Sequence, residues 1–311
     1  MIYLYDDIYL RHDAGMGHPE SPDRLTAINE ALKEADWYQD LVRPKATAVS
    51  IDILSLVHDP RYIELVERES KAGYMMLSTG DANVCEESYD IALQAVGGVL
   101  AAVDAVFEKK AKNAFCAVRP PGHHATKNRG MGFCLFNNIA VAARYAQKKY
   151  NVERVLIGDW DVHHGNGTHD IFYSDGSVFF MSTHQYPWYP GTGMYDEIGE
   201  GKGKGFTMNR PFPAGVGNKE IIAAFKGELL TAAKNFKPDF TLISAGFDSH
   251  VNDFLGGFRI DDDGFRELTK IMMEIADIAG DGRLVSILEG GYNLRSMASA
   301  VMGHMEELNN C

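Results

Sequence analysis

Two carboxylates and one imidazole in this sequence have the types and spacing of a metal site. Asp161 and His163 are two residues apart at the end of an apolar run, and in an extended chain that spacing places both side chains on the same side. Asp248 occupies the corresponding place after another apolar run. Oxygen and nitrogen ligands together favour Zn²⁺ or Fe²⁺ over Ca²⁺ or Mg²⁺. Three protein ligands leave positions open for water and substrate, which is typical of a catalytic site.

A second metal ion is the alternative at this site. Two-metal hydrolases need additional bridging carboxylates. Here Asp248 is followed by Ser249 and His250, with no second aspartate two positions on. The sequence therefore disfavours a pair of Mn²⁺ ions and predicts one metal ion.

Two adjacent histidines, His123 and His124, follow Pro121 and Gly122 in a turn. In isolation such a pair is reasonably explained as two surface residues, but beside a metal site it indicates acid–base chemistry. Asp159 and Asn166 lie in the neighbouring turn, and we expect Asp159 to orient His123 and Asn166 to orient His124. A carboxylate partner raises the basicity of an imidazole much more than a neutral amide does.

Tyr292 is the candidate donor to a developing oxyanion. It follows Glu289, Gly290 and Gly291 directly after an apolar run. Glycines let the backbone pass close to a ligand, and a tyrosine hydroxyl at that place could stabilise negative charge on a reacting oxygen. By itself, such a tyrosine is more often a core residue with a satisfied hydroxyl.

These residues must be positioned by a sheet. Short apolar runs alternate with longer segments of helical period, which predicts a parallel sheet covered by helices. The expected strands are 113–118, 154–158, 178–183, 239–245 and 283–288, and the expected helices are 22–35, 60–71, 87–109, 137–149, 219–235, 263–279 and 295–308. Each strand leads into a polar or Gly-rich turn, and ligands bind at that end of open α/β sheets.

The bulk composition narrows the choice of partners. With 30 basic and 43 acidic residues the net charge is −13, which disfavours nucleic acid. Such a charge would attract a cationic substrate, but taken alone it is better explained as an aid to solubility. The chain begins without a basic region, so no signal peptide is expected, and no apolar run is judged long enough to span a membrane. The four cysteines form no C-x-x-C pair, which suits the cytoplasm; they are Cys85, Cys116, Cys134 and Cys311.

The motifs together resemble the zinc-dependent histone deacetylase family, and most closely its class II and bacterial amidohydrolase branch. The resemblance runs from about His12 to the last helix. Its segments are Arg119-Pro-Pro-Gly-His123-His124, Gly132-Phe-Cys-Leu-Phe-Asn-Asn, Asp159-Trp-Asp161-Val-His163-His-Gly-Asn166-Gly-Thr, Pro190-Gly-Thr-Gly, Ser244-Ala-Gly-Phe-Asp248 and Leu288-Glu-Gly-Gly-Tyr292-Asn. It implies an arginase–deacetylase α/β fold with an eight-stranded parallel sheet and helices on both faces, formed as one catalytic domain by residues 1–311.

The resemblance also implies a role for each matching residue. The zinc ligands would be Asp161, His163 and Asp248, with His124 as general base, His123 as its electrostatic partner and Tyr292 as oxyanion donor. The substrate tunnel would be lined by Gly132, Phe133, Tyr189, Leu255 and Gly291, with Arg24 in a channel behind the metal. A structural K⁺ site would use Asp159, Asp161, His163, Ser182 and Thr183, and a second K⁺ site the main chain of Phe172, Asp175, Val178 and Phe206.

Two departures from the family pattern and one retained residue affect the chemistry. Asn166 stands where class I members carry Asp, which suggests a less basic His124. Tyr189 replaces the usual Phe and adds a hydroxyl near the tunnel. Tyr292 is retained where some inactive-leaning relatives have His, which favours an active enzyme.

The expected function is hydrolysis of acetyl-lysine in a protein or peptide. An acetylpolyamine is the alternative substrate, but Leu255 is apolar where an acidic gatekeeper would favour a polyamine. A ureohydrolase with two Mn²⁺ ions and a non-catalytic acyl-lysine binder are the rivals from other classes. No membrane partner is expected, and the sequence leaves the oligomeric state undecided.

Overall fold

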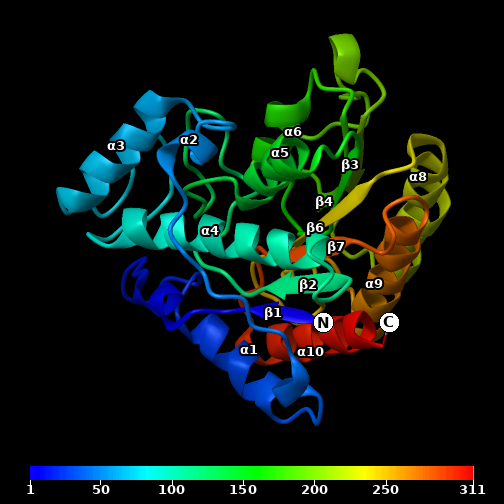
Figure 1. Cartoon of the computed structure of the whole chain (residues 1–311), viewed down its shortest axis with the longest axis horizontal. Helices are drawn as coiled ribbons and strands as arrows, with labels where there is room; N and C mark the ends of the chain where they lie inside the picture. The colour runs from blue at the N-terminus through cyan, green and yellow to red at the C-terminus, as the bar shows by residue number, and fades with distance from the viewer. Residues whose placement is uncertain (311) are drawn as a thin grey trace.

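The centre of the protein is a parallel sheet. The computed structural model describes residues 1–310, and Cys311 lies outside them. Seven strands in this described part form one sheet in the order β1-β2-β7-β6-β3-β4-β5 (Figure 1). The predicted α/β fold is confirmed, although eight strands was one too many. The strands are β1 (Ile2–Leu4), β2 (Asn113–Cys116), β3 (Val155–Asp159), β4 (Val178–Gln185), β5 (Thr207–Phe212), β6 (Phe240–Ala245) and β7 (Leu284–Leu288).

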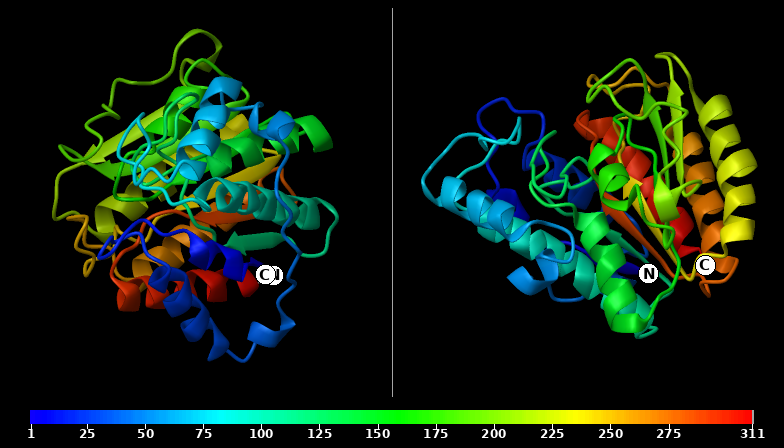
Figure 2. Two further views of the ribbon diagram at one scale, coloured as in Figure 1. Left: turned by 90° about the vertical axis from the view of Figure 1, so that its left-hand side faces the viewer. Right: turned by 90° about the horizontal axis from the view of Figure 1, so that it is seen from above.

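Helices cover both faces of the sheet, as Figure 2 shows in the view from above. On one face α4 packs on β1, β2 and β7, and α5 packs on β6; on the other, α9 packs on β6 and α10 on β2. A π-helical stretch, Ala224–Leu229, joins α7 to α8. The helices are α1 (Asp23–Lys33), α2 (Ile51–Leu54), α3 (Pro60–Lys71), α4 (Ser88–Phe107), α5 (Asn138–Tyr150), α6 (Asn166–Phe172), α7 (Asn218–Ala223), α8 (Leu230–Phe236), α9 (Asp262–Asp277) and α10 (Leu294–Asn309).

The two edge strands were not predicted. Strand β1 has only three residues, and β5 contains Pro211. Proline cannot donate a hydrogen bond to a sheet, so it is tolerated on an edge strand but hides the strand pattern. The five predicted strands lie between these edges, where cover on both faces produces the apolar runs that the sequence displays.

The prediction that no apolar run is long enough to cross a membrane was wrong for helix α4. It has 20 residues with a mean hydropathy of 1.6, which meets that criterion by length and composition. However, 67% of the apolar window is buried inside the fold. Contacts with β1, β2 and α5 therefore account for its composition as that of a core helix.

The carboxyl ends of the central strands lie level with one another. Asp159, the last residue of β3, is in register with Ser182 on β4 and Ser244 on β6. Ala245 of β6 is in register with Leu288 of β7. The loops that follow β3, β6 and β7 consequently begin side by side at one edge of the sheet.

Candidate active site

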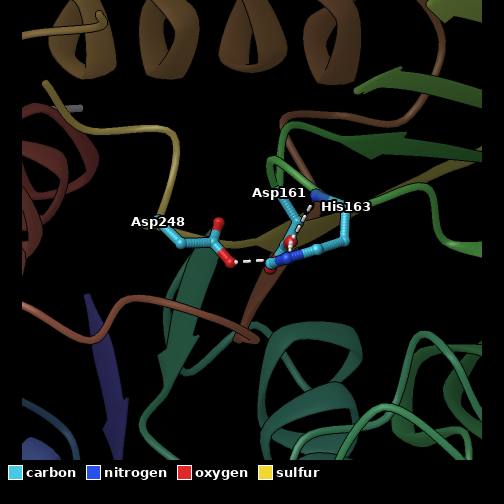
Figure 3. Close-up of side chains that lie close together, drawn as sticks. All are labelled: Asp161, His163 and Asp248. Carbon is cyan, nitrogen blue, oxygen red and sulfur yellow. Dashed lines mark hydrogen bonds and ion pairs between the residues drawn. The ribbon is translucent and has the colours of Figure 1, made fainter. Parts of the chain in front are cut away.

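The three expected metal ligands converge at this edge. Each offers one ligand atom, and these atoms lie within 4.8 Å of one another. The Nδ1 atom of His163 lies 3.0 Å from Asp161 Oδ1 and 3.1 Å from Asp248 Oδ2. Figure 3 shows the three side chains pointing toward one another, Asp161 and His163 from the loop after β3 and Asp248 from the loop after β6. Two carboxylates and one imidazole form a donor set suited to zinc.

The electrostatics of the site also suit a cation. Asp161 and Asp248 are both almost fully buried, and burial together with the charge of Asp161 raises the pKa of Asp248 to about 7. Two ionised carboxylates buried side by side are unfavourable unless positive charge is shared between them. The residues present therefore fit a divalent metal ion.

Two glycines, which have no Cβ atom, let the carboxylates of Asp161 and Asp248 lie close to the backbone of other loops. A Cβ atom on Gly246 would lie 2.1 Å from Asp161 Oδ2, and one on Gly290 would lie 2.1 Å from Asp248 Oδ2. Instead, the Gly290 amide donates to Asp161 Oδ2 at 2.8 Å, and the Val162 amide donates to Asp248 Oδ1 at 3.0 Å. The loop after β7 thus fixes Asp161, and the loop after β3 fixes Asp248.

His123 contacts the partner expected from the sequence. Its Nδ1 lies 3.0 Å from Asp159 Oδ2, and its Nε2 lies 3.8 Å from Asp161 Oδ2. Burial disfavours the imidazolium, but the charges of Asp161, Asp159 and Glu289 outweigh this and raise the pKa of His123 to about 10. The surrounding carboxylates therefore favour the protonated form of His123.

His124 contacts Asn166 and stays neutral. Its Nδ1 lies 2.7 Å from Asn166 Oδ1, and the Asn166 amide nitrogen donates to the His124 carbonyl at 3.4 Å. The amide therefore presents an acceptor to Nδ1, which must carry the proton and leaves Nε2 with a free lone pair. Burial and the charges of His123 and His163 lower the pKa of His124 well below its ordinary value.

Tyr292 reaches the same cavity from the loop after β7. Burial and the charge of Asp248 raise the pKa of Tyr292 well above its ordinary value, so its hydroxyl remains a donor. The fully buried Arg24 places its guanidinium 5.0 Å from the centre of the Tyr292 ring. Arg24 also donates to the carbonyl oxygens of Gly291 and Glu289, both at 2.6 Å. The channel role of Arg24 stays a prediction, but the structure shows that it holds this loop.

A cavity of about 240 Å³ leads to these groups. Its floor includes His124, His163 and Tyr292, and its walls and rim are Asp81, Gly132, Phe133, Trp188, Tyr189 and Leu255. Four of the five tunnel residues expected from the sequence line this cavity, and the fifth, Gly291, does not. Gly132 has a left-handed φ of +55°, and a Cβ atom there would lie 2.3 Å from the His124 ring. Glycine is therefore required where the wall meets the catalytic floor.

Gly291 does not line the cavity but shapes the loop beneath it. Its φ is +121°, and a Cβ atom would lie 2.9 Å from Met297 Cγ and 3.1 Å from Phe247 Cβ. This glycine thus allows the backbone to turn against the core just before Tyr292.

The residues of the expected K⁺ sites are only partly brought together. Asp159 and Ser182 are register partners on β3 and β4, and the buried Thr183 hydroxyl has no hydrogen-bond partner among residues 1–310. In the second set, the carbonyl oxygens of Phe172 and Phe206 each accept a backbone hydrogen bond. Both K⁺ sites stay predictions.

Three acidic residues at the site had no role in the sequence-based prediction. Glu289 Oε2 accepts hydrogen bonds from the amides of Gly122 at 2.7 Å and His123 at 3.1 Å. Asp81 lies at the cavity rim, and Asp253 binds the amide of Tyr292. Glu289 could have been found because it directly follows a strand, whereas Asp81 and Asp253 occur in loops without any such signal.

Comparison with known proteins agrees with this geometry. A model of the histone deacetylase domain matches residues 18–308. A probable deacetylase of Archaeoglobus fulgidus is 39% identical over 293 residues, which cover 94% of this chain and 81% of that protein. The polyamine deacetylase HDAC10 of Homo sapiens is 38% identical over 293 residues, covering 91% of this chain and 43% of that protein.

A solved structure extends the similarity to the whole fold. The crystal structure of the HDA15 HD domain matches with a TM-score of 0.94 at 38% sequence identity, covering 100% of this chain and 91% of that one. The family match, the relatives and the convergence of Asp161, His163 and Asp248 agree. This chain belongs to the histone deacetylase family and is a metal-dependent amidohydrolase with deacetylase chemistry.

Proposed function

We propose that this enzyme hydrolyses the acetyl amide of acetyl-lysine in proteins or peptides, giving acetate and the free amine of the lysine side chain, with zinc held by Asp161, His163 and Asp248. The observation that carries the proposal is the cavity of about 240 Å³ whose lining joins the imidazole of His163 to His124 and Tyr292. Such a cavity admits a linear amide and places its carbonyl among groups that can polarise it. Fe²⁺ is the alternative metal, because the same oxygen and nitrogen donors bind it.

The protonation state of each residue determines its role in the proposed reaction. Zinc, when bound, polarises the amide carbonyl and makes a water molecule more acidic. The free Nε2 of neutral His124 accepts the proton of the attacking water. The Tyr292 hydroxyl donates a hydrogen bond to the oxygen that gains negative charge. The positively charged His123, held by Asp159, stabilises that charge and is a source of the proton that the leaving amine requires.

The charges around the cavity favour acetyl-lysine over an acetylpolyamine. Asp81 is the one carboxylate among the cavity's lining residues. Its Oδ1 accepts hydrogen bonds from the Gly132 amide at 2.8 Å and the Tyr189 hydroxyl at 3.0 Å. Leu255, at the rim, offers no second carboxylate. A polyamine's distant ammonium would therefore find only the Asp81 carboxylate, whose Oδ1 already accepts two hydrogen bonds, although the name of the human relative supports that alternative substrate.

Steady-state kinetics on two substrates test this proposal. We expect kcat/KM for an acetyl-lysine peptide to exceed that for acetylspermidine by about tenfold, the effect of one missing favourable contact of about 1.4 kcal/mol. Replacing Leu255 with glutamate should narrow or reverse the preference, because it adds a second carboxylate to the rim beside Asp81. Leu255→Gln, of similar size but uncharged, is the matched control.

Three outcomes would contradict the proposal. A kcat/KM for acetylspermidine equal to or above that for the peptide would assign the enzyme to polyamines. Binding of the acetylated peptide without release of acetate would assign it to acyl-lysine recognition. Release of urea by protein that contains two Mn²⁺ ions per chain would instead identify a ureohydrolase.

The Tyr189 hydroxyl has an effect that can be measured separately. Because Tyr189 and the backbone beside Phe133 both bind Asp81, this carboxylate connects the two aromatic walls of the cavity. We expect Tyr189→Phe to raise KM by about 2- to 10-fold, the usual net effect of one lost hydrogen bond. The kcat should stay within about twofold, since the catalytic floor is untouched.

Tyr195→Phe is the matched control for that variant. Tyr195 belongs to the same long loop but is 61% exposed and packs against Arg210 instead of the cavity. Its KM should equal that of the wild type. An unchanged KM for Tyr189→Phe, or an equal change in both variants, would show that the hydroxyl does not shape the cavity.

A further inference from the structure

Asp253 gathers three backbone amides from two loops of the active site. Its Oδ2 accepts from the Tyr292 amide at 2.6 Å and from the Asn293 amide at 2.9 Å. Its Oδ1 accepts from the Leu255 amide at 2.9 Å. The residue is only 8% exposed, so these charge-assisted hydrogen bonds are shielded from water.

The peptide unit between Gly291 and Tyr292 is held at both ends. Its carbonyl oxygen accepts a hydrogen bond from Arg24 Nε at 2.6 Å, while its N–H donates to Asp253. Fixing both polar groups of a planar peptide fixes the plane itself. The direction of the bond from the Tyr292 backbone to its ring then follows, and with it the position of the hydroxyl.

The same carboxylate connects this loop to the cavity rim. Leu255 lines the cavity, and Tyr292 belongs to its floor. A second link runs in parallel, because the Asn293 side chain donates to the Asn252 carbonyl at 3.0 Å. The loops after β6 and β7 are thus tied together within a few residues of the reacting groups.

We propose that Asp253 is a positioning residue that holds the Tyr292 hydroxyl in its reactive position. The same carboxylate fixes the position of Tyr292 relative to Leu255 at the cavity rim. This inference rests on the proposed deacetylation, in which Tyr292 is the oxyanion donor. Asp253 touches neither substrate nor metal and acts through the backbone of Tyr292. A small displacement of a catalytic group can cost about 100-fold in rate.

Asp253→Asn tests the proposal with little change in volume. We expect kcat to fall by about 10- to 100-fold, with KM within about threefold and one zinc ion retained per chain. In a Tyr292→Phe background the same substitution should have almost no further effect on kcat, because the hydroxyl that it would misplace is already gone. Equal losses in both backgrounds, or loss of zinc together with rate, would overturn the proposal.

Hydrogen exchange supplies a readout that does not depend on activity. Peptides covering 290–296 and 254–256 should exchange faster in Asp253→Asn, since their amides lose an ionised acceptor. Unchanged exchange in both peptides would overturn the proposal even if the rate fell. Should the wild type release no acetate from any substrate, the proposed function would fail while this exchange result would still report the structural link.

Asp261→Asn is the matched control. The Asp261 carboxylate also accepts a backbone amide, that of Gly264 at 3.0 Å, at the start of α9. Asparagine is an equally good N-cap residue, so kcat and exchange of peptide 290–296 should match the wild type. A comparable fall in kcat for Asp261→Asn would show that any aspartate lost near these loops slows the enzyme, and would overturn the specific role of Asp253.

Discussion

Tyr292→Phe is expected to reduce kcat by about 10²–10³, the usual effect of removing one oxyanion donor. The phenylalanine ring can keep the edge contact with Phe133, whose centroid lies 6.0 Å from that of Tyr292, and the contact with Arg24. The loss should therefore come from the hydroxyl alone. Because Tyr292 contributes no metal-ligand atom, zinc content should stay at one ion per chain.

The kinetic signature separates this role from a binding role. An interaction made only in the transition state lowers kcat and kcat/KM equally and leaves KM unchanged. Acetate release from an acetyl-lysine peptide, measured together with zinc content and thermal stability, checks all three expectations. Near-normal turnover of Tyr292→Phe would remove Tyr292 from the chemical step.

Asp248→Ala is expected to abolish stoichiometric metal binding and, with it, activity. Only two ligands, Asp161 and His163, would remain of the set that lies within 4.8 Å. We expect zinc affinity to fall by more than about 100-fold, beyond the loss typical of residues that only orient a ligand. Elemental analysis after dialysis against a weak chelator measures this directly.

Thermal stability supplies an independent measure of the same loss. At zinc concentrations 100 times Kd, a native-state site adds about 2.7 kcal/mol to the free energy of unfolding. The wild type should show this gain, and Asp248→Ala should not. Asp90→Ala, at a side chain that is 60% exposed on α4, should behave as the wild type. Full zinc occupancy in Asp248→Ala would exclude Asp248 from the ligand set.

The central strands and their turns could be predicted because their signals are local. Strands β3 and β6 are buried on both faces, so they appear in the sequence as apolar runs. Residues that can bind a metal ion closely follow each run. The two-residue spacing of Asp161 and His163 is equally local. Parallel strands align their carboxyl ends, and this general rule was enough to bring Asp248 to the same place.

The edge strands and the supporting contacts depended on tertiary structure. Strand β5 has no apolar run, and pairing with β4 alone makes it a strand. Tyr189 and Asp81 meet across 108 residues of chain, and nothing near either residue indicates the other. The number of strands, seven, likewise depends on tertiary structure, because it depends on which segments pair with the edges of the sheet.

The sequence by itself determined which side chains carry the chemistry, since residue type and spacing limit what a metal or a proton can bind. Only the tertiary structure decided how those side chains are held. Asp253 and Glu289 act on the backbone amides of Tyr292 and His123. Every residue except proline has a backbone amide that can donate a hydrogen bond. The sequence around the donating residue therefore does not indicate which side chain accepts that hydrogen bond.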